Sequence, residues 1–365
     1  MAGGGLAGLI SAICLQRAGI PVTVVEKKIY PFHRVCGEYI SNEVVPFLKR
    51  MDLYPSDYAP AQINKLHLTS TSGQSASMLL DMGGFGISRY ALDEFLYQKA
   101  LSAGVEFILA KQVSEIKFEN ELFTAKIEGH SELHAGVVIG AFGKRSRLDK
   151  SLNRPFINKR SPYIGVKYHI RYDHPSDVIA LHNFKDGYCG ISMIENNRYN
   201  LCYLSARSNL SASENIDEME RQILSKNPHL RDIFANADFL FDKPEVINEI
   251  SFETKAPVEQ HILMCGDAAG MITPLCGNGM AMAIRAAKIV SEEVISYYNE
   301  HQSRQLMEDN YTQRWKASFQ TRLWSGRQIQ RLFGSVWASE LAVGLAKNVG
   351  SVANYLVRQT HGESF

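Results

Sequence analysis

The sequence predicts an α/β protein with a Rossmann-like dinucleotide-binding domain, an inserted antiparallel β-sheet domain and a helical C-terminus. A glycine-rich turn at residues 3–8 leads into a helical segment and then into a β-branched strand. A second strand, glycine turn and helix follow one another at residues 261–292. Between them, residues 162–252 hold short segments of aromatic and β-branched residues separated by turn residues, which is typical of an antiparallel sheet.

The first glycine turn has the spacing of a dinucleotide site. Gly3, Gly5 and Gly8 form GxGxxG, the helical segment Leu6–Ala18 follows, and the strand "PVTVVEKK" ends at Glu26. The first glycine permits a tight turn, the second lets the backbone approach a pyrophosphate, and the third lets helix and strand pack closely. The pyrophosphate is then expected at the helix N-terminus, with Glu26 on the ribose hydroxyls of an adenosine, which disfavours a 2′-phosphate there.

The strand that normally precedes this turn is missing, since only Met1 and Ala2 come before Gly3. Without it, neighbouring parallel strands would lack a central partner and leave amides unpaired. We therefore expect either that the natural start lies upstream or that the nucleotide site is weakened. In the second case the chain would be a scaffold without a cofactor.

The second turn lies in "HILMCGDAAGMITPLCGNGMAMAIRAAKIVSE". An apolar strand runs into a glycine turn, a proline loop follows, and an Ala-rich helix begins after it. No GK[ST] follows, so this is not a P-loop. An acid at the strand end is placed to bind a sugar-like hydroxyl, and the helix N-terminus is placed to stabilise negative charge. The residues that we assign to a cofactor here are Gly266, Asp267, Pro274, Gly277, Gly279 and Met280.

Together the two turns resemble the FAD-dependent oxidoreductases of the aromatic-hydroxylase superfamily, over about Gly3 to Glu292. The likeness is greatest to the geranylgeranyl reductase-like branch, which includes flavin monooxygenases and halogenase relatives. The resemblance implies that Asp267 binds the ribityl chain of FAD. It also implies that the proline and glycines of the second turn lie against the isoalloxazine.

Three further segments support the resemblance. "FHRVCGEYIS" is similar to the Arg-x-Cys-Gly-Glu segment that approaches the flavin and the substrate entrance, and "ISRYALDEFLYQKALSAGVEF" is similar to the Arg-x-x-Leu-Asp-x-x-Leu helix. "VVIGAFGKRSRLD" corresponds to a strand that ends in Gly-Ala-Asp-Gly in the family. Phe142 replaces that Asp, so either this motif makes no nicotinamide contact or another residue supplies it.

Cys36 and Glu38 are the candidate catalytic residues. The Cys36 thiol would orient substrate or tune the cofactor, the alternative being a small buried apolar residue. Glu38 would donate a proton or cap a helix. Arg34 and Arg89 are candidates for contact with the flavin or with the FAD phosphates, the alternative for Arg34 being a solvated loop residue.

The inserted sheet is expected to cover the cofactor as a substrate lid. Tyr188 and Tyr203 lie on its strands and either line an apolar cavity or belong to the core. We assign residues 1–60, 85–160 and 253–300 to a discontinuous FAD-binding domain, 61–84 and 161–252 to the substrate-binding sheet, and 301–365 to a helical region. Ligands bind at the carboxyl ends of strands in open α/β sheets, so the flavin ring is expected between the two domains.

Composition excludes several classes of protein. Among 365 residues, 39 Lys and Arg balance 38 Asp and Glu, so no overall attraction to nucleic acid is expected. Six cysteines without CxxC spacing indicate neither a zinc site nor a disulfide framework, and they fit a reducing cytoplasm. No apolar run approaches the roughly 18 residues of a spanning helix.

The C-terminal region mixes basic residues with Trp315, Phe319, Trp324 and Phe333. It forms either an amphipathic helix that caps the substrate pocket or a surface for peripheral membrane contact.

The expected function is that of a FAD-dependent oxidoreductase reduced transiently by NAD(P)H or another donor, because the sequence has no second complete GxGxxG. We place first a monooxygenase that hydroxylates an apolar, aromatic or polyketide-like small molecule. The alternative is a reductase of isoprenoid C=C bonds. The lid segment "GYCGISMIENN" departs from the Tyr-x-Trp-x-Phe-Pro pattern of true geranylgeranyl reductases, which favours the first interpretation.

Overall fold

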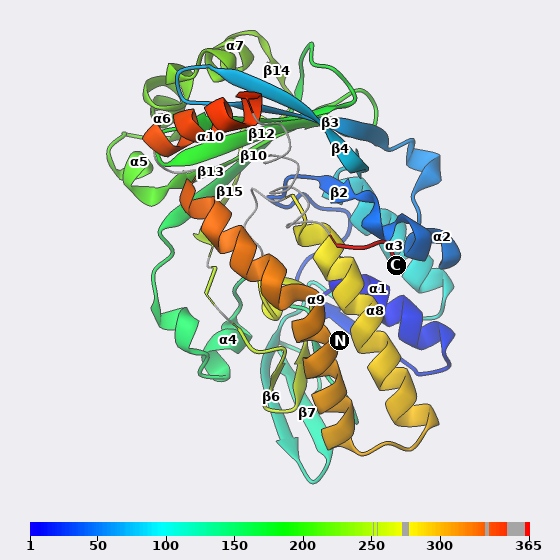
Figure 1. Cartoon of the computed structure of the whole chain (residues 1–365). Coiled ribbons are helices and arrows are strands. Elements are labelled where there is room, and N and C mark those ends of the chain that lie inside the picture. Colours follow the sequence, from blue (N-terminus) through cyan, green and yellow to red (C-terminus); the bar gives the residue numbers. More distant parts are fainter. Residues whose placement is uncertain (251, 254, 272–276, 333–335, 349–361) are drawn as a thin grey trace.

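The nucleotide-binding half is a sheet whose strands come from distant parts of the chain. The computed structural model describes residues 1–250, 252–253, 255–271, 277–332, 336–348 and 362–365. Strand β1 (Thr23–Glu26) pairs in parallel with β5 (Glu106–Leu109), and β9 (Ile139–Gly140) pairs in parallel with β17 (Ile262–Met264), beside β16 (Val258–Glu259). Helices α1 (Leu6–Arg17), α3 (Arg89–Ser102) and α8 (Gly279–Asn299) pack around it (Figure 1).

Residues 1–3 occupy the central position of this sheet. The N–H of Val25 donates to Met1 O (3.0 Å), and that of Gly3 donates to Val25 O (2.9 Å). On the other side the N–H of Ala2 donates to the carbonyl of Ile139 (2.9 Å), and Ala2 O accepts from Ala141 (2.8 Å). The expectation that the neighbouring strands lack a central partner is therefore wrong, because three residues are enough to bridge them.

The lid is a nine-stranded sheet with the order β14-β10-β13-β12-β11-β3-β4-β2, and β15 also pairs with β10. All its pairs are antiparallel except β3 with β11. The sheet includes Tyr39–Ser41, which we had assigned to the first domain. Its strands are β2 (Tyr39–Ser41), β3 (Ala61–Thr69), β4 (Ser75–Gly86), β10 (Tyr163–Arg171), β11 (Val178–Phe184), β12 (Gly187–Met193), β13 (Tyr199–Ala206), β14 (Asp238–Phe239) and β15 (Glu245–Ile250).

Helices cover the outer face of the lid and one side of the nucleotide-binding half (Figure 1). A core of apolar side chains joins the lid to α6 (Ile216–Gln222) and α7 (Pro228–Asn236), which follow α5 (Arg207–Ser211). The remaining elements are α2 (Val45–Arg50), the small sheet of β6 (Val113–Glu119), β7 (Leu122–Ile127) and β8 (Leu133–Ala135), α4 (Arg147–Ser151), α9 (Arg304–Leu332) and α10 (Val336–Asn348).

The C-terminal helices support the two halves rather than standing apart. Trp315 and Phe319 of α9 are buried in the core that includes α1 and α8, whereas Trp324 is 58% exposed. Phe333 lies outside the described residues. On α10, Glu340 accepts hydrogen bonds from the N–H and hydroxyl of Ser72 in the β3–β4 turn (2.9 and 3.0 Å).

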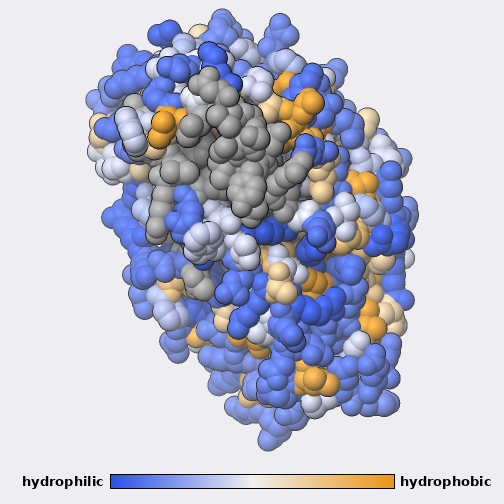
Figure 2. Space-filling view, viewed as in Figure 1, coloured by the Kyte–Doolittle hydropathy of each residue, from blue (hydrophilic) through white to orange (hydrophobic). Residues whose placement is uncertain are grey.

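The helices and the visible surface bear on a possible membrane contact. Among the described residues, no helix is long and apolar enough to cross a bilayer. Figure 2 shows a mostly hydrophilic face on which the apolar side chains outside the grey region form small separate groups. Peripheral membrane contact through the C-terminal helices stays a prediction.

Two buried or half-buried histidines of the lid, His67 and His182, are expected to make its stability depend on pH. The rings of His182 and His229 stack at 5.4 Å, and His67 lies 5.8 Å from His229. Burial, with a smaller effect of the neighbouring imidazoles, holds the pKa of His182 well below its usual range, and the same causes lower that of His67. The unfolded chain therefore binds protons more readily as pH falls below about 6.5.

We expect the free energy of unfolding to be highest above that pH and to fall on acidification. The measurement is the Tm at pH 7.5 and pH 5. The variant His182→Gln is expected to lose less Tm between the two, while exposed His130→Gln behaves as the parent. An equal loss in the parent and in His182→Gln would contradict this origin.

Candidate functional site

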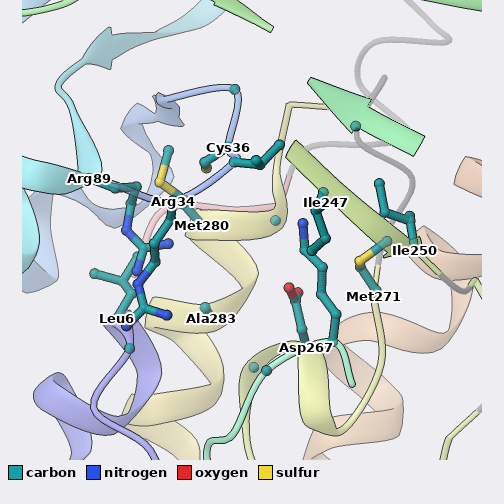
Figure 3. A pocket seen from close by; sticks show the side chains of 18 of the residues that line it. Leu6, Arg34, Cys36, Arg89, Ile247, Ile250, Asp267, Met271, Met280 and Ala283 are labelled. Atoms are coloured by element: carbon teal, nitrogen blue, oxygen red, sulfur yellow. The ribbon is translucent and has the colours of Figure 1, made fainter. Parts of the chain in front are cut away.

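One cavity of about 1230 Å³ lies between the parallel sheet and the lid. It is lined by both glycine turns, by the start of α8, by the loop around residue 36 and by lid strands. Glu26 and Asp267, which we assigned to opposite ends of one cofactor, both line it. Figure 3 shows Arg34, Arg89 and Leu6 on one side, Asp267 on the other, and Met280 and Ala283 of α8 between them. The space is continuous from one predicted half-site to the other.

The three glycines of the first turn differ in what a side chain at each position would meet. A Cβ on Gly3 (φ +105°) would lie 2.5 Å from Ala141 O, and a Cβ on Gly8 would lie 2.1 Å from Gly3 O. A Cβ on Gly5 would meet no described atom closer than 4.0 Å, the distance to Arg89 Nη2. Gly3 and Gly8 are therefore required by packing, whereas Gly5 leaves open space toward the cavity.

The N-terminus of α1 faces that open space. Leu6 and Ala7 line the cavity, and the first turn of the helix has neither an acidic residue nor a side-chain cap. The amides of a first helical turn lack intrahelical acceptors and carry partial positive charge, which suits a phosphate.

Glu26 is fixed at the end of β1. Its buried carboxylate accepts hydrogen bonds from the N–H of Gly4 (2.9 Å) and of Lys28 (3.1 Å). Because both donors belong to the backbone around the turn, the acid is held at the end of the cavity where the ribose of adenosine is expected.

Arg34 and Arg89 meet on one buried acid. Arg89 donates twice to the Asp93 carboxylate (both 2.8 Å), and Arg34 Nε donates to its Oδ2 (3.0 Å). Both arginines line the cavity, and Figure 3 shows them beside Leu6. This position fits the predicted contact with the cofactor phosphates. The sequence did not lead us to assign a role to Asp93, although this residue lies in the Arg-x-x-Leu-Asp segment.

The second turn lies where α1 and α8 approach each other. Gly266 has φ +63°, and a Cβ there would be 3.1 Å from the Cβ of Ala7 and 3.7 Å from that of Ala283. Lys255 Nζ donates to Asp267 O (2.8 Å). The backbone of the turn is thus held from outside, while the Asp267 carboxylate points into the cavity (Figure 3).

The loop after this turn is partly described. Pro274 lies outside the described residues. Gly277 has φ +65°, and it lines the cavity with Gly279 and Met280 at the start of α8. A Cβ on Gly277 would be 3.1 Å from the ring of Tyr39. The second helix N-terminus is therefore brought to the same cavity as the first.

Cys36 and Glu38 differ in what they can do. Cys36 is partly exposed and lines the cavity. Glu38 is fully buried and accepts from Lys167, from His169 Nε2 (2.7 Å) and from the N–H of Arg89 (2.8 Å). Burial alone would raise the pKa of Glu38, but Lys167 and His169 outweigh it and bring the pKa to about 2.

A carboxylate with that pKa, paired with Lys167 and His169, is ionised near neutral pH and has no proton to donate. This disfavours the proton-donor interpretation of Glu38. The alternative role as a cap fits better, because its acceptor oxygen meets the first N–H of α3.

The two predicted substrate tyrosines lie on opposite faces of the lid. Tyr188 packs with Leu204 and Ile250 on the face toward the cavity. Tyr203 also borders the cavity, but its side chain belongs to the core under α6 and α7, and its hydroxyl donates to Glu220 (2.7 Å). Successive residues of a strand point to opposite faces, which places Tyr203 away from a substrate.

Two groups of residues were missed from the sequence. One is the pair Lys167 and His169 on β10, whose signal was a lysine within an apolar strand, where burial is costly without a partner. The other is a wall of aliphatic side chains on β3, β4, β11, β13 and β15, with Met271 beside them. Among the described residues, no group of three or more His, Cys, Asp or Glu is arranged to hold a metal ion.

A family model described as FAD binding domain matches residues 1–322. The chain belongs to this FAD-binding family. It is a FAD-dependent oxidoreductase with the mixed α/β fold of its relatives. The residues present fit FAD, because the open side of Gly5, two helix N-termini, Glu26 and Asp267 share one cavity. Bound FAD would supply the redox chemistry, and the chain supplies placement and exclusion of water.

Curated sequence relatives include two kinds of protein. Digeranylgeranylglycerophospholipid reductase 1 of Methanopyrus kandleri is 24% identical over 349 residues, covering 90% of this chain and 88% of its own. Rifampicin monooxygenase of Rhodococcus hoagii is 22% identical over 308 residues, covering 78% and 61%.

Solved structures show the same two kinds. A geranylgeranyl bacteriochlorophyll reductase-like protein of Thermoplasma acidophilum has a TM-score of 0.80 at 17% identity, covering 100% of this chain and 95% of its own. PqsL of Pseudomonas aeruginosa, a probable FAD-dependent monooxygenase, has a TM-score of 0.73 at 15% identity, covering 93% and 96%.

Proposed function

We propose that this flavoprotein reduces isolated C=C bonds in a long, isoprenoid-like apolar chain. Both this reaction and hydroxylation fit the family and the fold, and one observation favours reduction. Besides Cys36, the cavity is lined on its lid side mainly by aliphatic side chains, with Tyr188 and Ser192 among them, and by Trp337 and Leu341 of α10. The wall consists of Leu66, Leu68, Met78, Leu80, Ile179, Leu181, Leu204, Ile247, Ile250 and Met271.

Such a wall suits a flexible hydrocarbon better than a compact aromatic ring with polar groups. Leu, Ile and Met side chains offer apolar area, and aliphatic side chains outnumber the hydrogen-bonding ones, such as Tyr188 and Ser192, that could fix a substituted ring. The digeranylgeranylglycerophospholipid reductases among the relatives support the same substrate class.

Hydroxylation of a smaller substrate is the second candidate. The likeness to rifampicin monooxygenase and the departure of "GYCGISMIENN" from the reductase pattern favour it. The two reactions differ in their product, so one experiment separates them.

We propose reduced nicotinamide nucleotide as the electron donor. Lysines follow the carboxyl ends of β5, β1 and β9, and they line the cavity beside the first turn. They are Lys27, Lys28, Lys111 and Lys144, with Lys150 close by in α4. This positive rim suits the phosphates of a transient nucleotide.

The test uses the purified holoprotein under anaerobic conditions. We expect a flavin absorbance spectrum, bleaching by NADPH or NADH, and a product of a prenylated lipid that has gained two hydrogens per reduced bond, measured by mass spectrometry. Addition of one oxygen atom after admission of air, without hydrogen gain, would establish hydroxylation instead.

A bulkier side chain in the aliphatic wall is expected to slow turnover of long substrates more than that of short ones. Leu181→Trp adds bulk beside Gly190. Space is already limited there, because a Cβ added to Gly190 would lie 3.3 Å from Leu181. Turnover of a long prenyl chain should fall roughly tenfold, since overfilling an apolar space costs about 1–3 kcal/mol. A substrate with one isoprene unit should be little affected. Leu79→Trp, at an exposed position of β4, is the matched control. Equal loss for both chain lengths would contradict the channel.

A further inference from the structure

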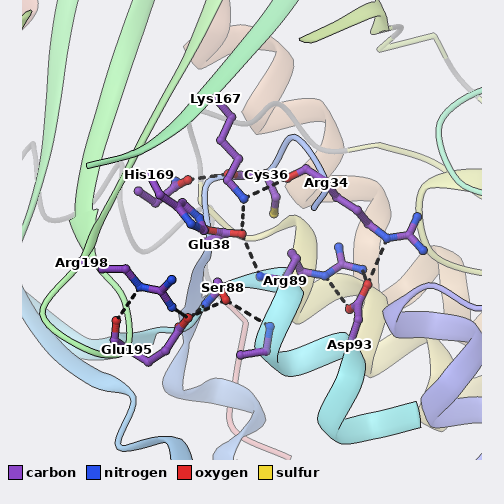
Figure 4. Close-up of polar contacts among 12 residues, drawn as sticks. Arg34, Cys36, Glu38, Ser88, Arg89, Asp93, Lys167, His169, Glu195 and Arg198 are labelled. Atoms are coloured by element: carbon purple, nitrogen blue, oxygen red, sulfur yellow. Dashed lines mark hydrogen bonds and ion pairs between the residues drawn. The ribbon is translucent and has the colours of Figure 1, made fainter. Parts of the chain in front are cut away.

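The loop that carries Cys36 is held by the lid rather than by its own domain. Lys167 of β10 is completely buried, and its amine donates to Arg34 O (3.2 Å) and to the Glu38 carboxylate. These two contacts lie on either side of Cys36 (Figure 4). A single lid side chain therefore fixes both ends of residues 34–38.

A second lid strand adds a contact at the middle of this loop. Asn200 of β13 donates from Nδ2 to Cys36 O (3.2 Å), and His169 Nε2 lies 2.7 Å from Glu38 Oε2. His169 and Asn200 are directly opposite each other in the β10–β13 register. The contacts thus come from one rigid patch of sheet.

The same network reaches the phosphate end of the cavity. Glu38 accepts from the N–H of Arg89, and Arg89 is in turn paired with Asp93. Next to it, Glu195 of the lid accepts from the N–H and the hydroxyl of Ser88 (both 2.7 Å). Figure 4 shows these contacts converging on the start of α3.

We propose that Lys167 is a positioning residue that holds the 34–38 loop so that Cys36 faces bound flavin, and that Glu38 extends the same constraint to Arg89. Burying this ion pair is costly, so stability alone accounts poorly for it, whereas a fixed geometry at a reaction centre accounts for it directly. The inference rests on the proposed function only for its turnover readout.

The principal test is Lys167→Met in the FAD-loaded full chain. Turnover of a prenylated lipid at saturating concentration should fall roughly tenfold to a hundredfold, as expected for a misplaced group, with KM little changed. The alkylation rate of Cys36 by iodoacetamide, followed by peptide mass spectrometry, should change severalfold because the loop is released. Neither readout moves if Lys167 is merely structural.

Tyr168→Phe is the matched control on the same strand. Tyr168 points to the opposite face, where its hydroxyl donates to Glu220 (3.0 Å), so it weakens the lid without touching the loop. Its Tm should fall, while alkylation of Cys36 and turnover stay at the parent values.

A double variant keeps the proposal testable if Lys167→Met does not fold. Lys167→Met with Glu38→Gln removes both charges, so no unpaired charge remains buried, and folding should recover while turnover stays low. A folded variant with parental alkylation and turnover would overturn the proposal. If the parent itself reduces no prenylated lipid, the proposed function fails, and the alkylation rates still decide whether Lys167 positions the loop.

Discussion

Gly5→Val is expected to give a folded protein that no longer retains FAD. The position is the N-cap of α1 in extended backbone (φ −77°, ψ −174°), which valine adopts readily. Outside its chain neighbours, the nearest described atom to the new Cβ would be Arg89 Nη2 at 4.0 Å, an ordinary contact distance. The branched side chain would occupy the space through which a pyrophosphate is expected to approach the helix amides. We expect FAD affinity to fall at least about 100-fold, equivalent to about 3 kcal/mol.

The measurement is flavin content by absorbance after gel filtration, together with the Tm of the apoprotein. Gly8→Val is the informative companion, because its Cβ would lie 2.1 Å from Gly3 O and should lower the apoprotein Tm as well. Gly5→Val should lower that Tm much less, by the small cost of valine at a helix N-cap. Full retention of flavin by Gly5→Val would show that FAD does not pass over this turn.

Arg154→Met is expected to cause the largest loss of stability. The buried guanidinium donates to Asp149 Oδ1 (2.9 Å), Glu259 Oε2 (2.6 Å) and Ala268 O (3.0 Å). Removing it leaves the buried Asp149 carboxylate without its cation, which costs about 3–5 kcal/mol in comparable cases. Since Ala268 follows Asp267, FAD retention should weaken too.

Urea unfolding of the apoprotein measures the loss of stability separately from any effect on FAD binding. Arg171→Met, which breaks the exposed pair with Asp238, is the control and should change the free energy of unfolding little. A similar small change for Arg154→Met would mean that the carboxylates relax into solvent.

Both glycine turns could be predicted from the sequence because their chemistry is local. Gly3 and Gly8 are required by close backbone approaches and Gly266 by its positive φ and the nearby Ala7 Cβ, and such local requirements leave a regular spacing. Their meeting in one cavity also followed, since carboxyl ends of parallel strands share an edge. The central strand was misjudged because a full strand was assumed where Met1–Gly3 make the needed bonds.

The roles of Glu38 and Tyr203 could not be predicted in the same way. Glu38 owes its charge state to Lys167, 129 positions away, and no local pattern encodes that contact. Tyr203 lies in a strand that is apolar on both faces, so alternation does not tell which face meets the cofactor. The lysine within the apolar run of β10 was the available hint.

The architecture of the nucleotide-binding half also bears on how the protein matures. Strand β17 and the Asp267 turn are translated long after residues 1–26 and after the entire lid, yet they complete the same sheet edge. Chains fold progressively from the ribosome, so the lid can assemble while the early strands still await their last neighbour. We therefore expect flavin to be captured only after β17 has joined the early strands, because both glycine turns line the cofactor cavity.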